Sequence, residues 1–539
     1  MRSFSNLASK KIPRFTNLAP QLNSLSPIST TIQNEIDKVL IDPPRIPAVV
    51  GHTKFQHMNQ LQYAGQNVVC QYHQPSYDVL REGLDSYEED KEKWNSLSLT
   101  DRLDIFLDVA DKLEYEYYDR MMAYTIVGQN KTPFEAEIDS ICELADFLRF
   151  NVSYVYQLHQ KQPFSPVIES FQGQDYMISN TSEYLPLNGF VASITPFNFT
   201  AIGGNLALTP LMLGNTVFWK PSENAILSNY LIYQILEECG LPPGILNFVP
   251  YDGADFLDVV TQREDLGAII FTGSSQVFDN IYGKVSSQIS KYKSYPRLIG
   301  ETGGKNYHFV HPSMKDKISY VAGKTFESAF GYSGQKCSAC SRIYLPESML
   351  EEFIDHLQEN IKTYLAVHQN NYGLIHRNSW EKSSNLLNKI KELATPTTKI
   401  VLGGNIQEDN FYMEPTVVVS SDPDSFLFQE EFFAPLLAIY PYQEEMVEET
   451  MELCRNATDY ALTGAVFSLD GDFLQKFGNK MKDTCGNYYI NDKSTGSVVG
   501  QQPFGGSGKS GTNDKAGDIN FIYRLANQRN VKKCFYDEI

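Results

Sequence analysis

The sequence predicts an α/β fold of two lobes, in which a doubly wound parallel sheet is followed by a second α/β lobe. Two observations carry this prediction. Short apolar runs alternate with helix-length segments over 184–298 and again over 299–493, a pattern typical of parallel sheets covered by helices. The chain has 539 residues, more than one hydrophobic core normally supports, and its 42% hydrophobic and 20% charged residues are an ordinary globular composition.

The first 34 residues differ in composition from the rest of the chain. They are rich in Ser, Thr and Asn, and no acidic residue occurs before Glu35. Their basic residues are Arg2, Lys10, Lys11 and Arg14. This composition is typical of a mitochondrial transit peptide and predicts a location in the mitochondrial matrix. A frayed cytosolic tail is the alternative.

Overall composition argues against two kinds of partner. The formal net charge of −20 would repel a phosphodiester backbone, so nucleic-acid binding is not expected. No run of 18 apolar residues occurs, so no membrane span is expected. The eight cysteines are scattered rather than dense, which indicates a reducing compartment.

The expected elements follow in chain order. Apolar residues at spacings of three and four predict helices from Ser98 to His159. Strands of the first lobe are expected at Phe190–Ile194, Thr216–Trp219, Ile245–Val249 and Ala268–Phe271. Strands of the second lobe are expected in the runs NYHFV, SRIYLP, FYMEPTVVV, PLLAIYPY, LTGAVFS and GNYYIND.

Two further segments have the composition of extended chain. Residues 162–183 mix proline, serine and β-formers without a helical period, and the tail from Asn520 also reads as extended. We expect 162–183 and 519–539 to form a bridging sheet at a subunit interface. The first lobe then takes 35–161 and 184–298 with part of 494–518, and the second lobe takes 299–493.

Polar residues follow the predicted strands of the first lobe. Asn198, in PFNF, presents a carboxamide that can donate to a developing oxyanion, although a helix cap is the alternative. Lys220 and Glu223, in WKPSE, can reach ribose hydroxyls. The Glu223 carboxylate would repel a 2′-phosphate, which favours NAD over NADP. An ordinary exposed helix start is the alternative for this pair.

Two glycine-containing turns supply further candidates. Gly273 and Ser274, in FTGS, would let the backbone approach a pyrophosphate. No GxGxxG follows any predicted strand, so the usual dinucleotide fingerprint is absent. Glu301 lies in GETGGKN, where flanking glycines give the carboxylate the freedom that a general base needs.

The stretch GQKCSACSR places Cys337 and Cys340 in a CxxC. Three uses are open on local sequence: a covalent nucleophile, a redox dithiol, and half of a zinc site. A zinc site needs a second ligand pair and none lies nearby, so no metal is expected. A thioredoxin-like pair should open a helix after the first strand of a small domain, unlike this one.

Read in order, PFNF, WKPSE, FTGS, GETGGKN, GQKC, EEFFAP and PFGGSGKSG resemble the motifs of the aldehyde dehydrogenase superfamily over roughly residues 45 to 530. GQKCSACSR and NDKSTGSVVGQQPFGG are most similar to its pyrroline-carboxylate branch. The resemblance implies NAD-dependent oxidation of L-glutamate 5-semialdehyde, which equilibrates with 1-pyrroline-5-carboxylate, to L-glutamate in proline degradation. Another semialdehyde such as succinate semialdehyde, or a non-catalytic protein of this fold, are the alternatives.

The resemblance also implies a role for each candidate residue. Cys337 would be the nucleophile, Asn198 with the Cys337 backbone N–H the oxyanion hole, and Glu301 the base for deacylation. The expected contacts to NAD are Lys220, Glu223, Gly273, Ser274, Glu431 and Phe433. The expected substrate contacts are Ser338, Gly496, Ser497 and Glu143.

Two of these roles carry a qualification. A solvated helical acid is the alternative reading of Glu143. Ala434 replaces the glycine usual after the phenylalanine of EEFFAP, and its methyl group is expected to shift Phe433. The resemblance further implies a homodimer or a higher homo-oligomer, and a link to a proline dehydrogenase that supplies the substrate.

Overall fold

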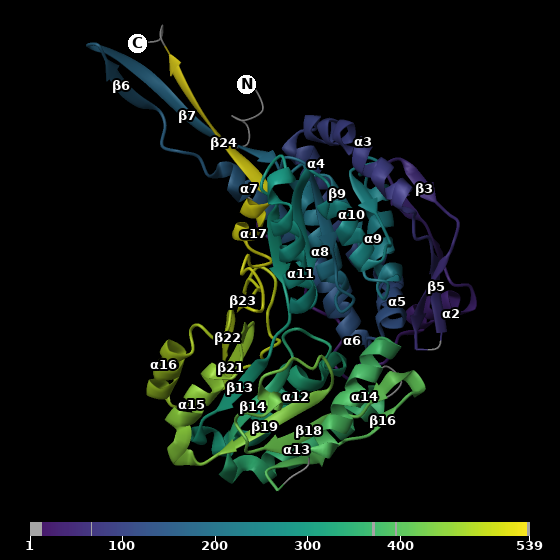
Figure 1. Cartoon of the computed structure of the whole chain (residues 1–539), viewed down its shortest axis with the longest axis vertical. Coiled ribbons are helices and arrows are strands. Elements are labelled where there is room, and N and C mark those ends of the chain that lie inside the picture. The colour runs from purple at the N-terminus through teal and green to yellow at the C-terminus, as the bar shows by residue number, and fades with distance from the viewer. Residues whose placement is uncertain (1–12, 66, 369–371, 394–395, 536–539) are drawn as a thin grey trace.

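The computed structural model describes residues 13–65, 67–368, 372–393 and 396–535. These residues form two α/β lobes and a ribbon of strands that projects from them (Figure 1). The predicted fold class is confirmed. No helix in the described part of the chain is both long and apolar enough to cross a membrane.

The first lobe is built on a sheet that has seven strands among the described residues, in the order β12-β11-β8-β9-β10-β2-β3. The parallel strands are β8 (Phe190–Ile194), β9 (Val217–Lys220), β10 (Leu246–Phe248), β11 (Leu266–Thr272) and β12 (Arg297–Glu301). The antiparallel edge, which was not predicted, is β2 (Ala48–Val50) and β3 (Thr53–Phe55). Every residue of β8, β9 and β10 is buried, as expected for parallel strands covered on both faces.

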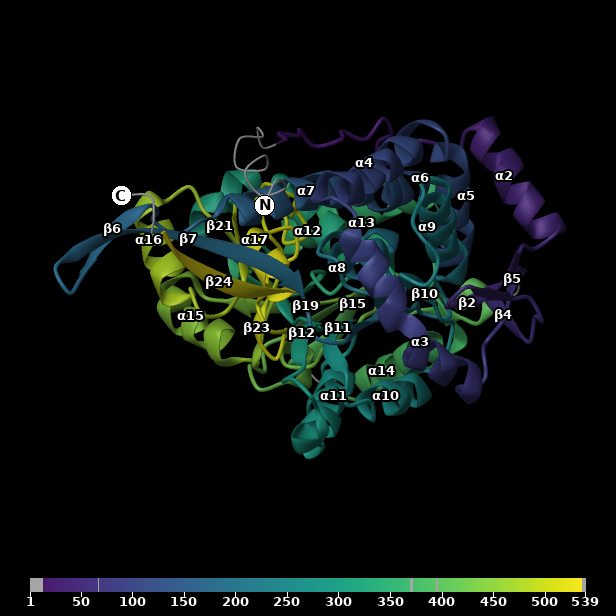
Figure 2. The same ribbon diagram turned by 90° about the horizontal axis from the view of Figure 1, so that it is seen from above.

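Helices cover both faces of this sheet (Figure 2). One face carries α4 (Leu99–Tyr115), α5 (Tyr118–Gln129), α7 (Leu144–Gln160), α8 (Thr200–Met212) and α9 (Ile226–Glu238). The other carries α3 (Tyr77–Ser96), α10 (Gly253–Thr261) and α11 (Ser275–Ser287). Along β8, Val191 packs into the first layer and Phe190, Ala192 and Ile194 into the second, which is the alternation of a strand.

The helical region predicted from Ser98 to His159 contains one irregular stretch. Between α5 and α7 lie the short helix α6 (Pro133–Ala136) and a π-helix, η1 (Glu137–Glu143). A π-helix is rare and frequently marks a functional site. This one carries three acidic side chains into the first lobe.

The second lobe has its own sheet, with seven strands in the described residues and the order β15-β18-β19-β14-β13-β21-β22. Its parallel strands are β13 (Asn306–Val310), β14 (Cys340–Pro346), β18 (Thr416–Ser420), β19 (Leu436–Tyr442), β21 (Thr463–Phe467) and β22 (Asn487–Ile490). The edge strand β15 (Thr398–Leu402) is antiparallel. Its helices are α12 (Ile318–Phe330), α13 (Leu350–His368), α14 (Arg377–Glu392), α15 (Val447–Asn456) and α16 (Gly471–Lys480). Each predicted run of this lobe contains a strand.

Three small groups of strands complete the fold. Their members are β1 (Arg45–Ile46), β4 (Gln60–Ala64) and β5 (Asn67–Tyr72); β16 (Ile406–Gln407) and β17 (Tyr412–Met413); and β20 (Tyr460–Ala461) and β23 (Ser507–Gly508). The last pair ties the 494–518 segment to the second lobe. This segment therefore contacts both lobes, because Glu301 at the end of β12 also bridges to Gly511.

The projecting ribbon consists of β6 (Val167–Phe171), β7 (Gln174–Pro186) and β24 (Ala526–Phe535), in the order β24-β7-β6. The two expected extended segments therefore pair with each other. The prediction that the tail is extended from Asn520 is wrong for its first residues, because the helix α17 (Ile519–Arg524) precedes β24. The Asp518 side chain caps this helix, and Phe521 and Ile522 are buried against the body.

The N-terminal region is packed on the body from residue 13 onward, since Ser153 Oγ donates to Pro13 O at 2.9 Å and the Phe15 and Phe150 ring centroids are 6.4 Å apart. Asn17 Nδ2 donates to Asp146 Oδ2 at 2.7 Å, and the backbone N–H groups of Gln21 and Leu22 donate to the Glu137 carboxylate at 2.9 Å each. The expected leader boundary at residue 34 falls inside α2 (Thr30–Ile41). Residues 17–25, here called the N-terminal strap, are thus part of the fold, and residues 1–12 of the expected leader lie outside the described residues.

Candidate active site

The strand order of the first lobe places the candidate residues at one crevice. From β8 the chain runs outward through β9 and β10, then returns to the other side of β8 as β11 and β12. The carboxyl ends of strands at such a reversal form the usual ligand crevice of a doubly wound sheet. Asn198 follows β8, Gly273 and Ser274 follow β11, and Glu301 ends β12, so all four lie at this edge.

A cavity of about 720 Å³ lies beside the crevice. The candidate residues that line it are Cys337, Ser338, Glu301, Ser497 and Glu143. They come from the π-helix, the end of β12, the loop before β14 and the 494–518 segment. The structure therefore brings together residues that lie far apart in the sequence.

The loop that carries Cys337 is sharply bent. Tyr332 and Ser333 have φ of 52° and Gly334 has φ of 69°, the left-handed region. A Cβ on Gly334 would lie 2.3 Å from Ala434 O, so only glycine fits this turn. Asn306 Nδ2 donates to Cys337 O at 2.7 Å and fixes the far side of the loop.

The surroundings of Cys337 favour the thiol over the thiolate. Burial raises its pKa above the usual range, and the nearby carboxylates of Glu301 and Glu431 raise it further. Attack on a carbonyl therefore requires that the thiol proton leave to a base. Cys340 is a different kind of cysteine, because it is 1% exposed, packs in the core beside β13, and donates from Sγ to Arg342 O at 3.4 Å.

Asn198 lies in the turn between β8 and α8 and is 4% exposed. Its Nδ2 donates to Gln335 O at 3.1 Å, two residues before Cys337. Among the described residues nothing accepts from its second N–H, and its Oδ1 has no hydrogen-bond partner. The carboxamide is therefore held beside the cysteine loop with a donor to spare.

Glu301 has the protonation behaviour of a catalytic base that works near neutral pH. Burial raises its pKa to about 8, although the backbone N–H of Gly506 and the charge of Lys515 act in the opposite direction. Oε1 accepts from Gly506 N at 3.1 Å. Its own carbonyl accepts from Gly273 N at 3.1 Å, so the base and the FTGS turn are directly connected.

Glu431 lies beside the turn GETGGKN, and Phe433 lies beside the turn that follows β8. Glu431 Oε1 accepts from Gly304 N at 2.9 Å, and burial raises the pKa of Glu431 to about 7. Its carboxylate fills the space where a Cβ on Gly303 would sit, 2.1 Å from Oε2. The Phe433 ring meets the Phe197 ring edge-on, with centroids 6.0 Å apart.

Lys220 and Glu223 lie together at the carboxyl end of β9. Lys220 Nζ is 3.5 Å from Glu223 Oε2, and the Lys220 side chain is buried while that of Glu223 is 63% exposed. The next helix, α9, begins at Ile226, later than expected. Ser274 caps α11 by accepting from Val277 N at 3.4 Å, which leaves a helix N-terminus facing the crevice.

The expected substrate contacts differ in what they offer. Ser338 and Ser497 line the cavity, but Ser497 Oγ already donates to Gln502 O at 2.7 Å. Gly496 does not line the cavity, although its neighbours Thr495 and Ser497 do. Glu143 faces the cavity, and burial raises its pKa to about 8, which is unlike a solvated helical acid.

Several cavity residues were not predicted from the sequence. They are Lys131, Glu135, Lys336 and residues 22–25 of the strap. A capping box at Thr132 and Glu135, with Pro133 at the first helical position, was a readable sign of a helix start there. No pattern in the strap itself indicates that it reaches the cavity.

Comparisons with known proteins agree with this geometry. The sequence model of the "Aldehyde dehydrogenase family" matches residues 50–531. The chain is 38% identical over 538 residues to "Delta-1-pyrroline-5-carboxylate dehydrogenase, mitochondrial" of Homo sapiens, covering 98% of this chain and 92% of the relative. It is 40% identical over 482 residues to "Probable delta-1-pyrroline-5-carboxylate dehydrogenase" of Schizosaccharomyces pombe, covering 87% and 85%.

A solved structure is similar over nearly the whole chain. The Delta-pyrroline-5-carboxylate dehydrogenase from Mycobacterium tuberculosis bound with NAD has a TM-score of 0.87 at 33% identity, covering 97% of this chain and 96% of that one. The fold of the two lobes is thus similar to that of a solved structure.

Proposed function

The chain belongs to the aldehyde dehydrogenase family, and from that premise we propose that it oxidises L-glutamate 5-semialdehyde to L-glutamate with NAD⁺. One observation carries the proposal: a single cavity joins a cysteine, a carboxylic base and a second buried acid beside a strand-end crevice. The semialdehyde is the open form of 1-pyrroline-5-carboxylate, the compound named in the relatives.

The crevice fits a dinucleotide. Lys220 and Glu223 can hold ribose hydroxyls, the α11 N-terminus at Ser274 suits a pyrophosphate, and Phe433 with Phe197 can flank a flat ring. The exposed Glu223 carboxylate disfavours a 2′-phosphate. NAD⁺, when bound, accepts the hydride that leaves the aldehyde carbon.

The chain's own residues perform acyl transfer. The Cys337 thiol first releases its proton to solvent water, and the thiolate then attacks the aldehyde carbon. The resulting oxyanion receives hydrogen bonds from Asn198 Nδ2 and the Cys337 backbone N–H. After oxidation Cys337 carries a thioester. Glu301 takes a proton from the water that hydrolyses this thioester, which suits a carboxylate with a pKa of about 8.

The cavity recognises an amino acid through opposite charges. Glu143 lies near Lys131 and Lys336, whose charges lower its raised pKa. A substrate ammonium group would take the place of such a charge beside Glu143. Ser338 and the backbone of the 495–497 loop would hold the carboxylate, since the Ser497 hydroxyl is already committed as a donor to Gln502.

Steady-state kinetics test this function. L-glutamate 5-semialdehyde and succinate semialdehyde, which lacks the ammonium group, are compared with NAD⁺ and with NADP⁺. We expect the amino-acid aldehyde with NAD⁺ to have the highest kcat/KM, and Cys337→Ala to abolish NADH formation. An equal or higher kcat/KM with succinate semialdehyde would overturn the substrate assignment.

We further propose that the protein acts in the mitochondrial matrix, as the word "mitochondrial" in several relatives' names and the basic N-terminus suggest. Because the chain contacts the body from Pro13 onward, the leader should end before Pro13. Import into isolated mitochondria followed by N-terminal sequencing tests this. Cleavage within or after the strap would contradict it.

We also propose that two copies associate through the projecting ribbon. Ile168 and Phe171 on β6 are 73% and 65% exposed, which is costly for apolar side chains on a lone edge. Light scattering should give the mass of a dimer or larger assembly, and Ile168→Lys with Phe171→Lys should reduce it. An enzyme that oxidises proline, such as a proline dehydrogenase, is the class of partner that would supply the substrate.

A further inference from the structure

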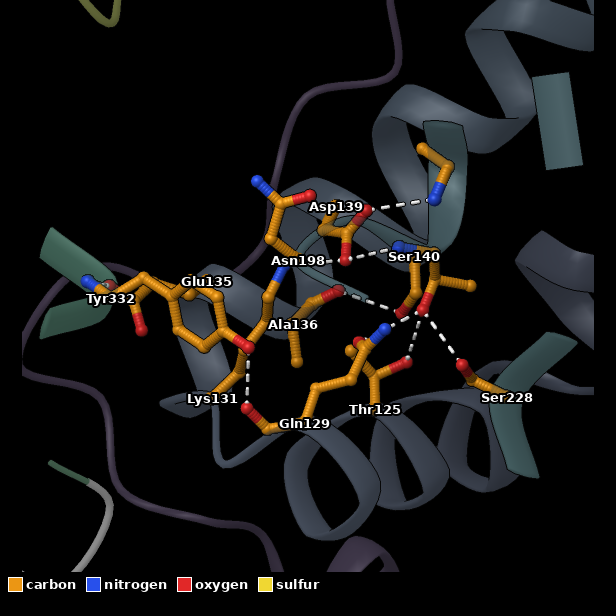
Figure 3. A network of polar contacts seen from close by, with 12 residues as sticks. Thr125, Gln129, Lys131, Glu135, Ala136, Asp139, Ser140, Asn198, Ser228 and Tyr332 are labelled. Carbon is orange, nitrogen blue, oxygen red and sulfur yellow. Dashed lines mark hydrogen bonds and ion pairs between the residues drawn. The ribbon is translucent and has the colours of Figure 1, made fainter. Parts of the chain in front are cut away.

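We propose that Asp139 is a positioning residue for the oxyanion hole, because it holds the turn that carries Asn198 (Figure 3). Asp139 lies in the π-helix and is fully buried. The inference rests on the proposed function only through the role of Asn198 in stabilising an oxyanion on a group bonded to Cys337.

Asp139 caps a helix that has no cap of its own. Helix α8 begins at Thr200, and the preceding Phe199 offers no side-chain acceptor. Asp139 Oδ2 accepts from Thr200 N, and Oδ1 accepts from Ala201 N, each at 2.9 Å. Capping by a carboxylate satisfies two of the open N–H groups of the first turn and suits the positive end of the helix dipole.

The carboxylate is itself fixed by a buried cation. Lys131 Nζ donates to Asp139 Oδ2 at 2.6 Å, and both side chains are almost fully buried. Lys131 also lies over the rings of Phe199, at 4.3 Å, and Tyr332, at 4.9 Å. The pair thus clamps Phe199, the neighbour of Asn198, against the cysteine loop.

Gln129 holds the same turn from its other side. Its Nε2 donates to Phe197 O at 2.8 Å, and its Oε1 accepts from Thr200 Oγ1 at 3.0 Å. Tyr332 in turn donates from its hydroxyl to Gln129 O at 2.8 Å. Residues 197–201, here called the oxyanion turn, are therefore bonded on both sides of Asn198, and the same network reaches the cysteine loop.

Two reactions of Cys337 separate positioning from general structural damage. With p-nitrophenyl acetate, the thiol releases its proton to buffer, Sγ bonds to the carbonyl carbon and the C=O electron pair moves to oxygen. Collapse then expels p-nitrophenolate and leaves acetyl-Cys337. With iodoacetamide, Sγ bonds to a saturated carbon and displaces iodide. An oxyanion forms only in the first reaction, so only that reaction uses Asn198.

We expect Asp139→Asn to slow the p-nitrophenolate burst by about 10- to 100-fold, since misplacing one donor by about 1 Å has effects of this order. The rate of alkylation should not change. In an Asn198→Ala background the Asp139→Asn effect should disappear, because both changes remove one interaction. The matched control is Asp265→Asn, which breaks a 2.9 Å ion pair with Arg263 just before β11, at the opposite edge of the sheet.

Asp139→Asn leaves Lys131 without its buried partner, and the variant could fail to fold for that reason. Gln129→Met is a second variant that tests the same proposal. It removes two contacts to the oxyanion turn without removing a charge, so the burst should slow and alkylation should not. Equal slowing of both reactions, or an unchanged burst in these folded variants, would overturn the proposal. Failure to oxidise glutamate semialdehyde with this burst pattern intact would overturn the proposed function instead.

Discussion

Raising the pH should speed deacylation of Cys337 if Glu301, a buried acid, is the base as proposed. Burial raises the pKa of Glu301 from 4.5 to about 8. A general base acts only in its deprotonated form. With a pKa of about 8, roughly 9% of Glu301 is ionised at pH 7 and about 90% at pH 9, so the deacylation rate should rise about tenfold.

The assay uses p-nitrophenyl acetate between pH 6 and pH 10. The slow release of p-nitrophenolate after the burst reports hydrolysis of acetyl-Cys337, and it needs no NAD⁺. In Glu301→Gln the side chain does not ionise between pH 6 and pH 10 and cannot act as a base. The deacylation rate should therefore be low, and its rise with pH should be lost. A flat profile in the native protein, or the same rise in Glu301→Gln, would refute the assignment of Glu301 as the base.

The raised pKa of Glu301 also makes the folded protein less stable as the pH rises, whereas deacylation becomes faster. A carboxyl whose pKa is raised on folding binds its proton more tightly in the folded state. The contribution of Glu301 to stability is therefore fully present below pH 4.5 and is lost as the pH rises to about 8. The enzyme should become faster and less stable over the upper part of this window, and Glu301→Gln should weaken both trends in urea unfolding.

Three further predictions concern other parts of the site. Deleting residues 1–12 should leave activity unchanged. Deleting 1–26 removes the strap, which lines the cavity and contacts the body, and should therefore raise KM for the semialdehyde and lower Tm. Equal KM and Tm in the two truncations would show that the strap plays no part. Gly334→Ala should lower the free energy of unfolding in urea by about 1–3 kcal/mol and slow the p-nitrophenolate burst, because the turn needs a positive φ and has no room for a Cβ. An unchanged free energy of unfolding would contradict this. Glu223→Ala should lower KM for NADP⁺ relative to NAD⁺, and an unchanged ratio would mean that this carboxylate does not select the cofactor.

The strands that position the site were predictable because strands buried on both faces are apolar along their whole length. The runs around Val191 and Val217 are apolar along their whole length, which is what two covered faces require. The role proposed for Cys337 rests on a different kind of signal. Its local sequence left three uses open, and only its order after PFNF and GETGGKN selected one of them.

The contacts that orient these groups were not predictable, because their partners lie far along the chain. Asn17 bonds Asp146 across 129 positions, and a stretch rich in polar residues gives no sign of such a partner. Asp139 reads as one more acid in a helical run, and the π-helix that turns it toward Thr200 has no distinct period in the sequence. Strands and helices leave a repeating pattern of apolar residues in the sequence. A single hydrogen bond between two distant side chains leaves no such pattern.

The π-helix η1 explains how one short segment serves three parts of the active site. Glu137 accepts from the strap at Gln21 and Leu22, Asp139 accepts from the start of α8, and Glu143 faces the cavity. Carboxylates are costly to bury, so donors or a cation are needed. Glu137 accepts from the strap, Asp139 accepts from α8 and pairs with Lys131, and Glu143 is stabilised by the charges of Lys131 and Lys336. Displacing the strap removes donors from Glu137 and so perturbs the helix that also holds Asp139. We therefore expect the truncation that removes the strap to slow the Cys337 ester burst as well as raise KM, while alkylation of Cys337 by iodoacetamide stays unchanged.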